Sequence, residues 1–349
     1  MVNGHDTAAL PYRTLSQFIA RLPKTETHLH IEGALPLELL RTVAPDRYPG
    51  GAPPWWSPAH RYADFASFEA TLLDNAVLWY TTPERYHQAA AVVFQGLARQ
   101  NVRYVETSFH LPIVQFIHAD GRDLLDAIRS AAPEGMTVQV FAGMRRIDYT
   151  PALAPVIDSL HTWEHLAGVD LHGEESWRLE PWTAPVWRRV AEAGKIIKAH
   201  AGELAGAASV REVVETLGVR RVEHGIRAIE DPAVVELLRD RDITCDTCPI
   251  SNVRLGIVPS LAQHPLPRLL EAGVRCTVST DDPFCFGNTL TDEYLALASD
   301  MQLSPADLAG VARNGFEIAL MDDTARASCL AELDAVTGID PAGGRTLRL

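Results

Sequence analysis

The chain has 349 residues, of which 47% are hydrophobic and 22% are charged, and its formal net charge is −14. This composition is typical of a globular protein with a large apolar core. The acidic balance, and the absence of any Lys/Arg cluster longer than a pair, argue against nucleic acid or an anionic membrane as a partner.

The five cysteines are odd in number and lie in the C-terminal half, at positions 245, 248, 276, 285 and 329. Residues 1–21 lack the cationic and apolar pattern of a secretory signal, and no 18-residue apolar run predicts a membrane span. We therefore expect reduced thiols and a cytoplasmic location.

The N-terminal part predicts a short helix at 15–22 after a polar lead, then a strand that begins at Thr25, then a helix at 37–43. A Pro-, Gly- and Trp-rich segment follows from 44 to 65, and it predicts a long irregular insertion after this first βα unit. Its adjacent residues Trp55 and Trp56 suggest either a mobile lid or an anchor that fastens the insertion to the body of the protein.

From residue 67 onward, predicted helices and strands alternate. We expect helices at 67–80, 84–99, 123–132, 152–161, 184–193, 209–217, 233–239 and 266–272, and strands at 102–109, 137–144, 167–172, 195–200, 221–224, 243–248 and 274–280. Several of these strands are short apolar runs, as expected for strands buried on both faces.

With the first strand, the pattern contains eight βα units. It predicts an α/β fold consisting of a single (β/α)8 TIM barrel over residues 1–349, with extra N- and C-terminal helices. A doubly wound open sheet fits less well, because the first strand is not followed by the glycine-rich turn of dinucleotide-binding folds.

Metal-binding and acidic residues follow several of the predicted strands. Side chains alternate along a strand, so His28 and His30 share one face and form a chelating pair. Later strands end in the motifs His-Ala-Gly-Glu at 200–203, Glu-His-Gly at 223–225 and Ser-Thr-Asp-Asp-Pro at 279–283. In a closed barrel the carboxyl ends of the strands surround one mouth, so we expect these motifs to form one site.

The motifs, together with residues 22–35 and the Cys-Pro-Ile-Ser-Asn sequence at 248–252, resemble the adenosine/adenine deaminase family of the amidohydrolase superfamily. The resemblance covers most of the chain, with the motifs in matching order and spacing. It implies one zinc ion, with water in the remaining position, and the ligands His28, His30, His200 and Asp281. Three imidazoles and a carboxylate suit Zn²⁺, and an open position is typical of a catalytic site.

The same resemblance implies hydrolytic deamination of a 6-aminopurine at C6. Glu203 matches the proton donor to ring N1, and His224 matches the residue that orients the zinc-bound water and takes its proton. Asp282 matches the group that donates to N7, which requires a protonated carboxyl because N7 is an acceptor. The backbone N–H of Gly173 matches the contact to N3.

The residue that we expect on the sugar side of the substrate is Glu32. Many adenosine enzymes carry aspartate there, and the longer carboxylate shortens the pocket. We expect adenosine or deoxyadenosine as substrate, with free adenine or a modified adenosine such as aminodeoxyfutalosine as the alternative. Nucleotides are disfavoured because no lysine cluster or phosphate loop is present, although Arg145 and Arg146 follow the third strand. The oligomeric state is not indicated.

Three other interpretations were considered. A binuclear hydrolase would need a bridging lysine at the end of the fourth strand, which has none, and a cysteine zinc site would need a proline before the pair Cys245 and Cys248. A non-catalytic purine-binding barrel would need neither Glu203 nor His224. Among the remaining histidines, we expect those at 110 and 172 as weaker pocket candidates and those at 60, 87, 161, 165 and 264 in structural positions.

Overall fold

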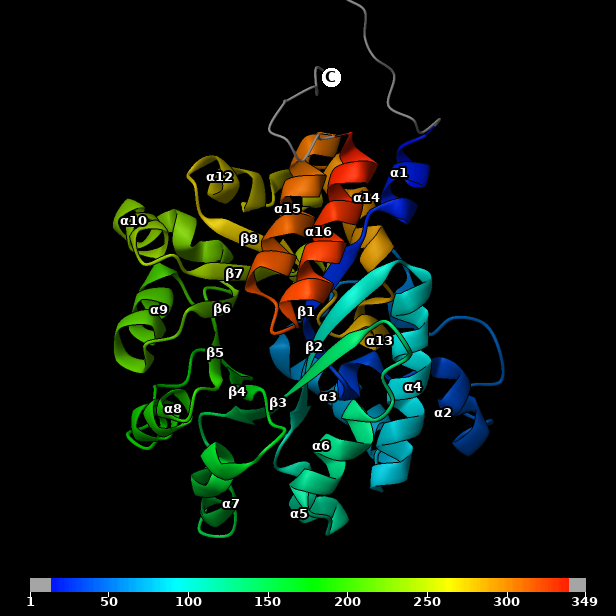
Figure 1. Cartoon of the computed structure of the whole chain (residues 1–349). Coiled ribbons are helices and arrows are strands. Elements are labelled where there is room, and N and C mark those ends of the chain that lie inside the picture. Colours follow the sequence, from blue (N-terminus) through cyan, green and yellow to red (C-terminus); the bar gives the residue numbers. More distant parts are fainter. Residues whose placement is uncertain (1–13, 339–349) are drawn as a thin grey trace, which may run out of the picture.

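The computed structural model describes residues 14–338, so the polar lead at 1–13 lies outside it. Eight parallel strands form a barrel with helices around it (Figure 1). The strands are β1 (Lys24–His30), β2 (Val102–His110), β3 (Thr137–Arg145), β4 (Gly168–His172), β5 (Ile196–Ala201), β6 (Arg221–His224), β7 (Thr244–Thr247) and β8 (Arg275–Val278). The predicted TIM-barrel fold is confirmed.

Each strand pairs with the next one along the chain, and the sheet closes between its first and last strands. The closing contact is a parallel bridge between Leu29 and Asp281. There the N–H of His30 donates to the carbonyl of Asp281, and the N–H of Asp281 donates to the carbonyl of His28, both at 3.1 Å. Closure therefore brings the end of β8 directly beside the paired histidines of β1.

The helices that surround the barrel include all those expected from the sequence. They are α1 (Leu15–Arg21), α2 (Leu37–Val43), α3 (Phe65–Trp79), α4 (Pro83–Arg99), α5 (Ile113–Ile117), α6 (Gly121–Arg129), α7 (Ala154–Ser159), α8 (Thr183–Glu192), α9 (Ala207–Glu212), α10 (Pro232–Asp240), α11 (Pro249–Arg254), α12 (Leu266–Glu271), α13 (Pro283–Phe286), α14 (Leu290–Ser299), α15 (Pro305–Ile318) and α16 (Asp323–Thr337).

Two details differ from the expected helices. The helix expected at 209–217 is α9 followed by a π-helical turn, Val213–Leu217, which ends at Gly218. The short helices α5, α11 and α13 were not expected, and the last two begin at Pro249 and Pro283. Proline suits the first helical position because its ring fixes φ and its missing N–H would have no helical partner there. The helix α11 carries Ser251 and Asn252 to the mouth of the barrel, and α13 directly follows Asp282.

The insertion after α2 is fastened to the segment that follows β8. The indole N–H groups of Trp55 and Trp56 both donate to the carbonyl of Phe284, and the hydroxyl of Tyr62 donates to the carbonyl of Cys285. Both tryptophan rings also meet the ring of Phe284 edge to face. These contacts favour the anchor over the mobile lid.

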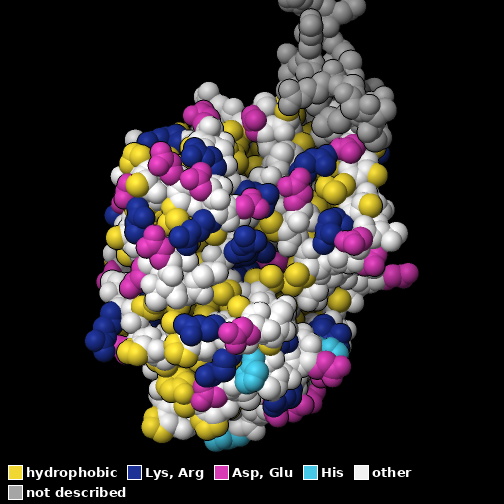
Figure 2. Space-filling model, turned by 60° about the vertical axis from the view of Figure 1, so that its left-hand side comes forward, with side chains coloured by type: hydrophobic (Ala, Val, Ile, Leu, Met, Phe, Trp, Pro, Cys, Tyr) yellow, Lys and Arg dark blue, Asp and Glu magenta, His cyan; other side chains and the backbone are white. Residues whose placement is uncertain are grey.

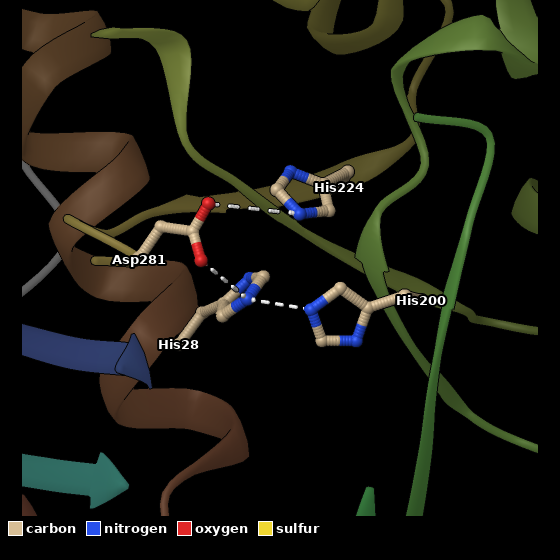
Figure 3. Close-up of side chains that lie close together, drawn as sticks. All are labelled: His28, His200, His224 and Asp281. Carbon is tan, nitrogen blue, oxygen red and sulfur yellow. Dashed lines mark hydrogen bonds and ion pairs between the residues drawn. The ribbon is translucent and has the colours of Figure 1, made fainter. Parts of the chain in front are cut away.

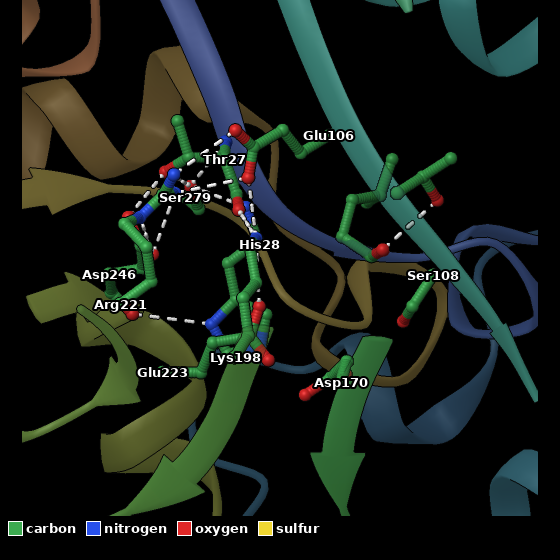
Figure 4. Close-up of polar contacts among 12 residues, drawn as sticks. Thr27, His28, Glu106, Ser108, Asp170, Lys198, Arg221, Glu223, Asp246 and Ser279 are labelled. Atoms are coloured by element: carbon green, nitrogen blue, oxygen red, sulfur yellow. Dashed lines mark hydrogen bonds and ion pairs between the residues drawn. The ribbon is translucent and has the colours of Figure 1, made fainter. Parts of the chain in front are cut away.

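A charged cluster fills the barrel below the mouth (Figure 4), and we call its residues Glu106, Lys198, Arg221 and Asp246 the barrel floor. The Arg221 guanidinium contacts Glu106 at 3.0 and 3.1 Å and Asp246 at 2.8 Å, while Lys198 Nζ lies 2.5 Å from Glu106. Burial alone would raise the pKa of Glu106, but the two cations outweigh it and lower that pKa. The floor charges therefore neutralise one another inside the protein.

Candidate active site

Three imidazole nitrogens converge at the mouth of the barrel. Nε2 of His28 lies 3.3 Å from Nε2 of His30 and 3.1 Å from Nε2 of His200, and the other two are 3.3 Å apart. Oδ1 of Asp281 lies 3.5 and 3.4 Å from the β1 nitrogens. The alternation of side chains along β1 produces this pair, as expected from the sequence.

The spacing of these atoms fits a metal ion. An ion about 2.0 to 2.1 Å from each nitrogen in tetrahedral geometry separates its ligand atoms by about 3.3 Å. Nδ1 of each ring faces away from the centre: that of His28 toward Asp246 O at 3.2 Å, that of His30 toward Ser108 Oγ at 2.8 Å, and that of His200 toward Asp170 Oδ1 at 3.2 Å. Such outer partners orient metal-binding imidazoles, so the residues present fit a zinc ion.

Burial sets the protonation of two of these rings. It lowers the pKa of His28 to about 4 and that of His30 to about 3, so both are neutral and can donate a lone pair to a metal. For His200, burial acts in the same direction, but Asp170 and Glu223 outweigh it and raise the pKa.

A second, overlapping set of possible ligands contains His224 (Figure 3). The ligand atoms of His28, His200, His224 and Asp281 all lie within 4.8 Å of one another. Nε2 of His224 is 3.4 Å from Oε2 of Glu203 and 3.9 Å from Oδ2 of Asp281. Nε2 of His30 lies 3.3 Å from Nε2 of His28 and from Nε2 of His200, which is the spacing of ligands on one metal ion. This spacing favours His30 as a ligand and leaves His224 beside Glu203.

Two of these residues have unusual backbone conformations. His224 has φ 63° and Asp281 has φ 65°, in the left-handed region that favours glycine. A side chain in this region costs of order 1 to 3 kcal/mol, and such strain concentrates at functional sites. The hydrogen bonds that close the barrel on either side of Asp281 help to maintain its conformation.

Two buried carboxyl groups at the mouth retain their protons. Burial raises the pKa of Glu203 and that of Asp282 well above the ordinary range, and Asp281 raises both further. Oδ1 of Asp282 is buried with no hydrogen-bond partner among the described residues. A Cβ at Gly33 would lie 1.6 Å from this oxygen, which explains the glycine after Glu32. An acid that is neutral and unpartnered is available as a donor to a ligand.

The loop that carries Glu203 is held by a carboxylate that the sequence analysis did not single out. The two oxygens of Glu175 accept from the backbone N–H groups of residues 202–205, at 2.5 to 3.0 Å, and from Ser209 Oγ. Glu175 is a positioning residue for Glu203. Its place in the long loop after β4 gave no pattern from which the contact could be predicted.

Two further buried residues were also missed. Asn252, on α11, contacts both His224 and Glu203, and His264 contacts Asn252. His264 lies in a loop, in the structural position expected for it, but the sequence did not reveal its partners: the residue is 4% exposed and hydrogen-bonded at both ring nitrogens. Only the folded chain brings a residue from before α12 next to the sixth strand.

The predicted site residues gather around one cavity that opens to solvent. His28 contacts His200 from below the cavity. The other predicted residues line the cavity: His30, Glu32, Gly173, His200, Glu203, His224, Asp281 and Asp282. The expected weaker candidates, His110 and His172, also line it, with 3.0 Å between Nδ1 of the first and Nε2 of the second. The structure therefore brings the predicted residues together around one cavity, and their individual roles stay predictions.

The substrate side of the cavity combines one carboxylate with an apolar wall. Oε1 of Glu32 accepts from the hydroxyl of Tyr86 at 2.6 Å and from the N–H of His110 at 3.1 Å, and burial raises its pKa to about 7. Opposite it, α3 contributes a mainly apolar wall, comprising Phe65, Phe68, Leu72, Leu73, Ala76 and Val77.

The cysteines take no part in a candidate metal site. All five are buried and unpaired, and no group of possible metal ligands within residues 14–338 includes one. Lys198 points into the barrel below His200, as expected, and donates to the carbonyl of Thr27 at 2.7 Å.

Comparison with known proteins agrees with this geometry. The family model described as adenosine deaminase matches residues 23–336. The chain belongs to the adenosine deaminase family. A curated adenine deaminase from Cupriavidus necator is 32% identical over 329 residues, which cover 92% of this chain and 93% of that protein. Members of this family are metal-dependent hydrolytic deaminases of purines, and this chain is one of them.

Two solved structures are similar to the whole barrel. The adenine deaminase from Arthrobacter aurescens superimposes with a TM-score of 0.80 at 28% identity, over 90% of this chain and 98% of that one. An amidohydrolase from Burkholderia ambifaria with bound zinc superimposes with a TM-score of 0.78 at 22% identity, over 95% and 96% of the two chains. The second likeness concerns the fold.

The face drawn in Figure 2 has no charged patch, among the residues that the structure describes, that predicts a large charged partner. On the face in Figure 2, basic and acidic side chains are interspersed, without a field of one sign. Within residues 14–338, no helix combines the length and the apolar character that a membrane crossing requires. The cavity is therefore the feature that defines this deaminase.

Proposed function

We propose that this protein hydrolyses adenine to hypoxanthine and ammonia with one zinc ion per chain. The observation that carries the proposal is the pair of buried, protonated carboxyl groups, Glu203 and Asp282, at the mouth that also gathers the imidazoles. The C6 amino group of adenine lies between two ring acceptors, N1 and N7. Two acids that keep their protons supply a donor for each.

The chemistry divides among the residues as follows. A zinc ion on His28, His30, His200 and Asp281 would lower the pKa of a water molecule to roughly 7. Glu203 donates its proton to N1, which makes C6 open to attack by the water oxygen, while Asp282 donates to N7.

The remaining contacts orient the reactants and complete the proton balance. His224 orients the attacking water, and the backbone N–H of Gly173 contacts N3. When the C6–N bond breaks, one proton of the water leaves with the amine as ammonia, and the other restores Glu203. The oxygen stays on C6, and N1 retains the proton that Glu203 gave.

The choice of adenine replaces the adenosine that we expected first from the sequence. The names of the relatives support it. Glu32 also supports it, because a carboxylate fixed by Tyr86 and His110 can accept from N9–H, a group that adenine has and adenosine lacks. The apolar wall of α3 offers few partners for ribose hydroxyls.

Arg145, the arginine that lines the cavity, does not favour a nucleotide as substrate. Arg145 contacts Asp148 at 3.0 Å and Glu69 at 3.5 Å, so two carboxylates already neutralise its guanidinium. A phosphate would have to compete with both. The cytoplasmic location expected from the thiols stays a prediction.

The test is a substrate panel on the zinc-loaded full chain: adenine, adenosine, deoxyadenosine and AMP, followed by ultraviolet absorbance and by ammonia release. We expect the highest kcat/KM for adenine and one zinc per chain by elemental analysis. A higher kcat/KM for adenosine would replace the substrate, and absence of ammonia from all four compounds would overturn the proposal. Two metals per chain would favour the binuclear alternative.

A further inference from the structure

A line of buried hydrogen bonds runs from the start of α12 to His224. The backbone N–H of Leu266 donates to Nδ1 of His264 at 3.2 Å. Nε2 of His264 lies 3.2 Å from Oδ1 of Asn252, and Nδ2 of Asn252 lies 3.2 Å from Nδ1 of His224. Asn252 is 0% exposed, so water does not compete for these contacts.

The direction of every bond in this line follows from its first member. A backbone N–H can only donate, so Nδ1 of His264 is an acceptor, and a neutral imidazole then carries its proton on Nε2. Burial lowers the pKa of His264 to about 3, which keeps the ring neutral. Its Nε2–H therefore donates to the amide oxygen of Asn252, and that assignment fixes which end of the amide faces His224.

The amide nitrogen of Asn252 can only donate, so Nδ1 of His224 must accept. The same Nδ2 also faces Oε1 of Glu203 at 3.4 Å, which is an acceptor as well. A proton on Nδ1 of His224 would place two donors against each other. The proton of a neutral His224 is consequently on Nε2, on the side that faces Glu203 and Asp281.

We propose that His264 and Asn252 are positioning residues that fix His224 as its Nε2–H tautomer. The Nε2–H group of His224 then donates a hydrogen bond to the attacking oxygen. This rests on the proposed deamination. It differs from the role that the family resemblance implies for His224, in which the ring takes the proton of the water. A donor placed at the attacking oxygen stabilises the negative charge that the oxygen carries.

The tautomer can be measured directly on the zinc-loaded full chain labelled with ¹⁵N-histidine. Two-bond ¹H–¹⁵N correlations distinguish the nitrogen that carries the proton, and spectra of His224→Gln and His264→Gln assign the two rings. We expect both His224 and His264 as Nε2–H tautomers. An Nδ1–H tautomer of His224 would overturn the inference, and this measurement needs no variant to be stable or active.

The decisive variant is Asn252→Asp, which replaces the donor that faces His224 by an acceptor. We expect the His224 signal to switch to the Nδ1–H tautomer, and kcat for adenine to fall by about 10²-fold or more. KM should change by less than about threefold, since Asn252 does not line the cavity. A lower kcat with an unchanged tautomer would assign Asn252 a merely structural role and contradict the inference.

The matched pair of changes at the far end of the line is His264→Gln and His264→Leu. The amide of glutamine can still donate to Asn252, so we expect His264→Gln to retain most of kcat and the Nε2–H signal of His224, whereas His264→Leu should lose both. An equal loss of kcat in the two variants would contradict the proposal that His264 acts through Asn252 on His224. Failure of the chain to deaminate any purine would overturn the proposed function, whereas an Nδ1–H His224 in an active enzyme overturns this inference alone.

Discussion

Two buried clusters of ionisable groups lie within one barrel, and they differ in how their charges are satisfied. In the barrel floor, Arg221 and Lys198 are paired with carboxylates at 2.5 to 3.1 Å. At the mouth, Glu203 and Asp282 instead keep their protons, and Asp282 has a buried oxygen without a partner among the described residues. The charged groups of the floor are paired without a ligand, whereas the buried carboxyl oxygen of Asp282 at the mouth needs a ligand as its hydrogen-bond partner.

Glu223 connects the two clusters. One of its oxygens lies 3.2 Å from Lys198 Nζ (Figure 4). The other lies 3.0 Å from Nδ1 of His200. The floor thus holds an anion that orients an expected metal ligand. Changes at the mouth should therefore act on catalysis, and changes in the floor should act on stability and only indirectly on the metal.

The largest effect on the mouth is expected for Glu203→Gln. The amide cannot transfer a proton to N1, so kcat should fall by about 10² to 10⁴-fold while adenine still binds. Steady-state kinetics and calorimetric titration with adenine measure the two quantities. The exposed Glu236→Gln on α10 is the matched control and should leave both unchanged. If Glu203→Gln kept full turnover, a purine-binding role for Glu203 would replace the catalytic one.

The floor is tested by Lys198→Met. Removal of Lys198 leaves the buried carboxylate of Glu223 without its cation and that of Glu106 with Arg221 alone, and we expect a loss of about 3 to 5 kcal/mol in the free energy of unfolding. Urea denaturation of the zinc-loaded protein measures it. Lys195→Met is the control, because Lys195 Nζ donates to the carbonyls of Trp163 and Leu166 and pairs with no carboxylate among the described residues. We expect this substitution to lower the free energy of unfolding by about 1 kcal/mol. Equal losses of unfolding free energy in the two variants would mean that the ion pairs of the floor contribute no more to stability than the contacts of Lys195.

The same contrast explains what the sequence could predict. The strands follow from short apolar runs with regular spacing, and the period of two along β1 places His28 and His30 on one face. Barrel topology then brings the strand ends together, so residues on β5, β6 and β8 join them without any knowledge of side-chain packing. Local patterns and one topological rule therefore account for the fold and for the strand-end motifs that meet at the cavity, whereas the α3 wall of the cavity was not predicted.

The supporting residues could not be predicted in this way. Glu175 is in a long loop and accepts from backbone groups of residues 202–205, and His264 follows the short 3-10 helix Leu261–Gln263 and contacts Asn252 on α11. Neither contact repeats with a strand or helix period, because each depends on how a loop folds over the mouth. The missed residues orient the reactive ones, and they come from loops, where sequence patterns carry the least information.

A smaller effect is expected for Glu32→Asp, which acts at the substrate side of the mouth. The shorter carboxylate withdraws from the ring and makes room for a substituent on N9. We expect kcat/KM for adenine to fall by about tenfold, and the ratio of adenosine to adenine turnover to rise by about the same factor. Competition assays with both substrates in one vessel measure the ratio. A fall in both rates at constant ratio would mean that Glu32 does not sense the N9 position.

The smallest effect is a pH dependence from His264, which belongs to the support of the mouth. Its pKa is about 3 in the folded chain and 6.5 in the unfolded chain, because burial disfavours the charged ring. Between these values the unfolded chain binds the extra proton, so this contribution to stability is present above pH 6.5 and decreases as the pH falls. From pH 7.0 to 5.5 the wild type should lose about 1 kcal/mol more than His264→Gln. Urea denaturation of both proteins at the two pH values tests this, and any loss of metal common to both cancels in the difference. Parallel losses would show that His264 is protonated in the folded state as readily as in the unfolded one. Its Nδ1 would then carry a proton against the N–H of Leu266, which contradicts the acceptor role assigned to Nδ1.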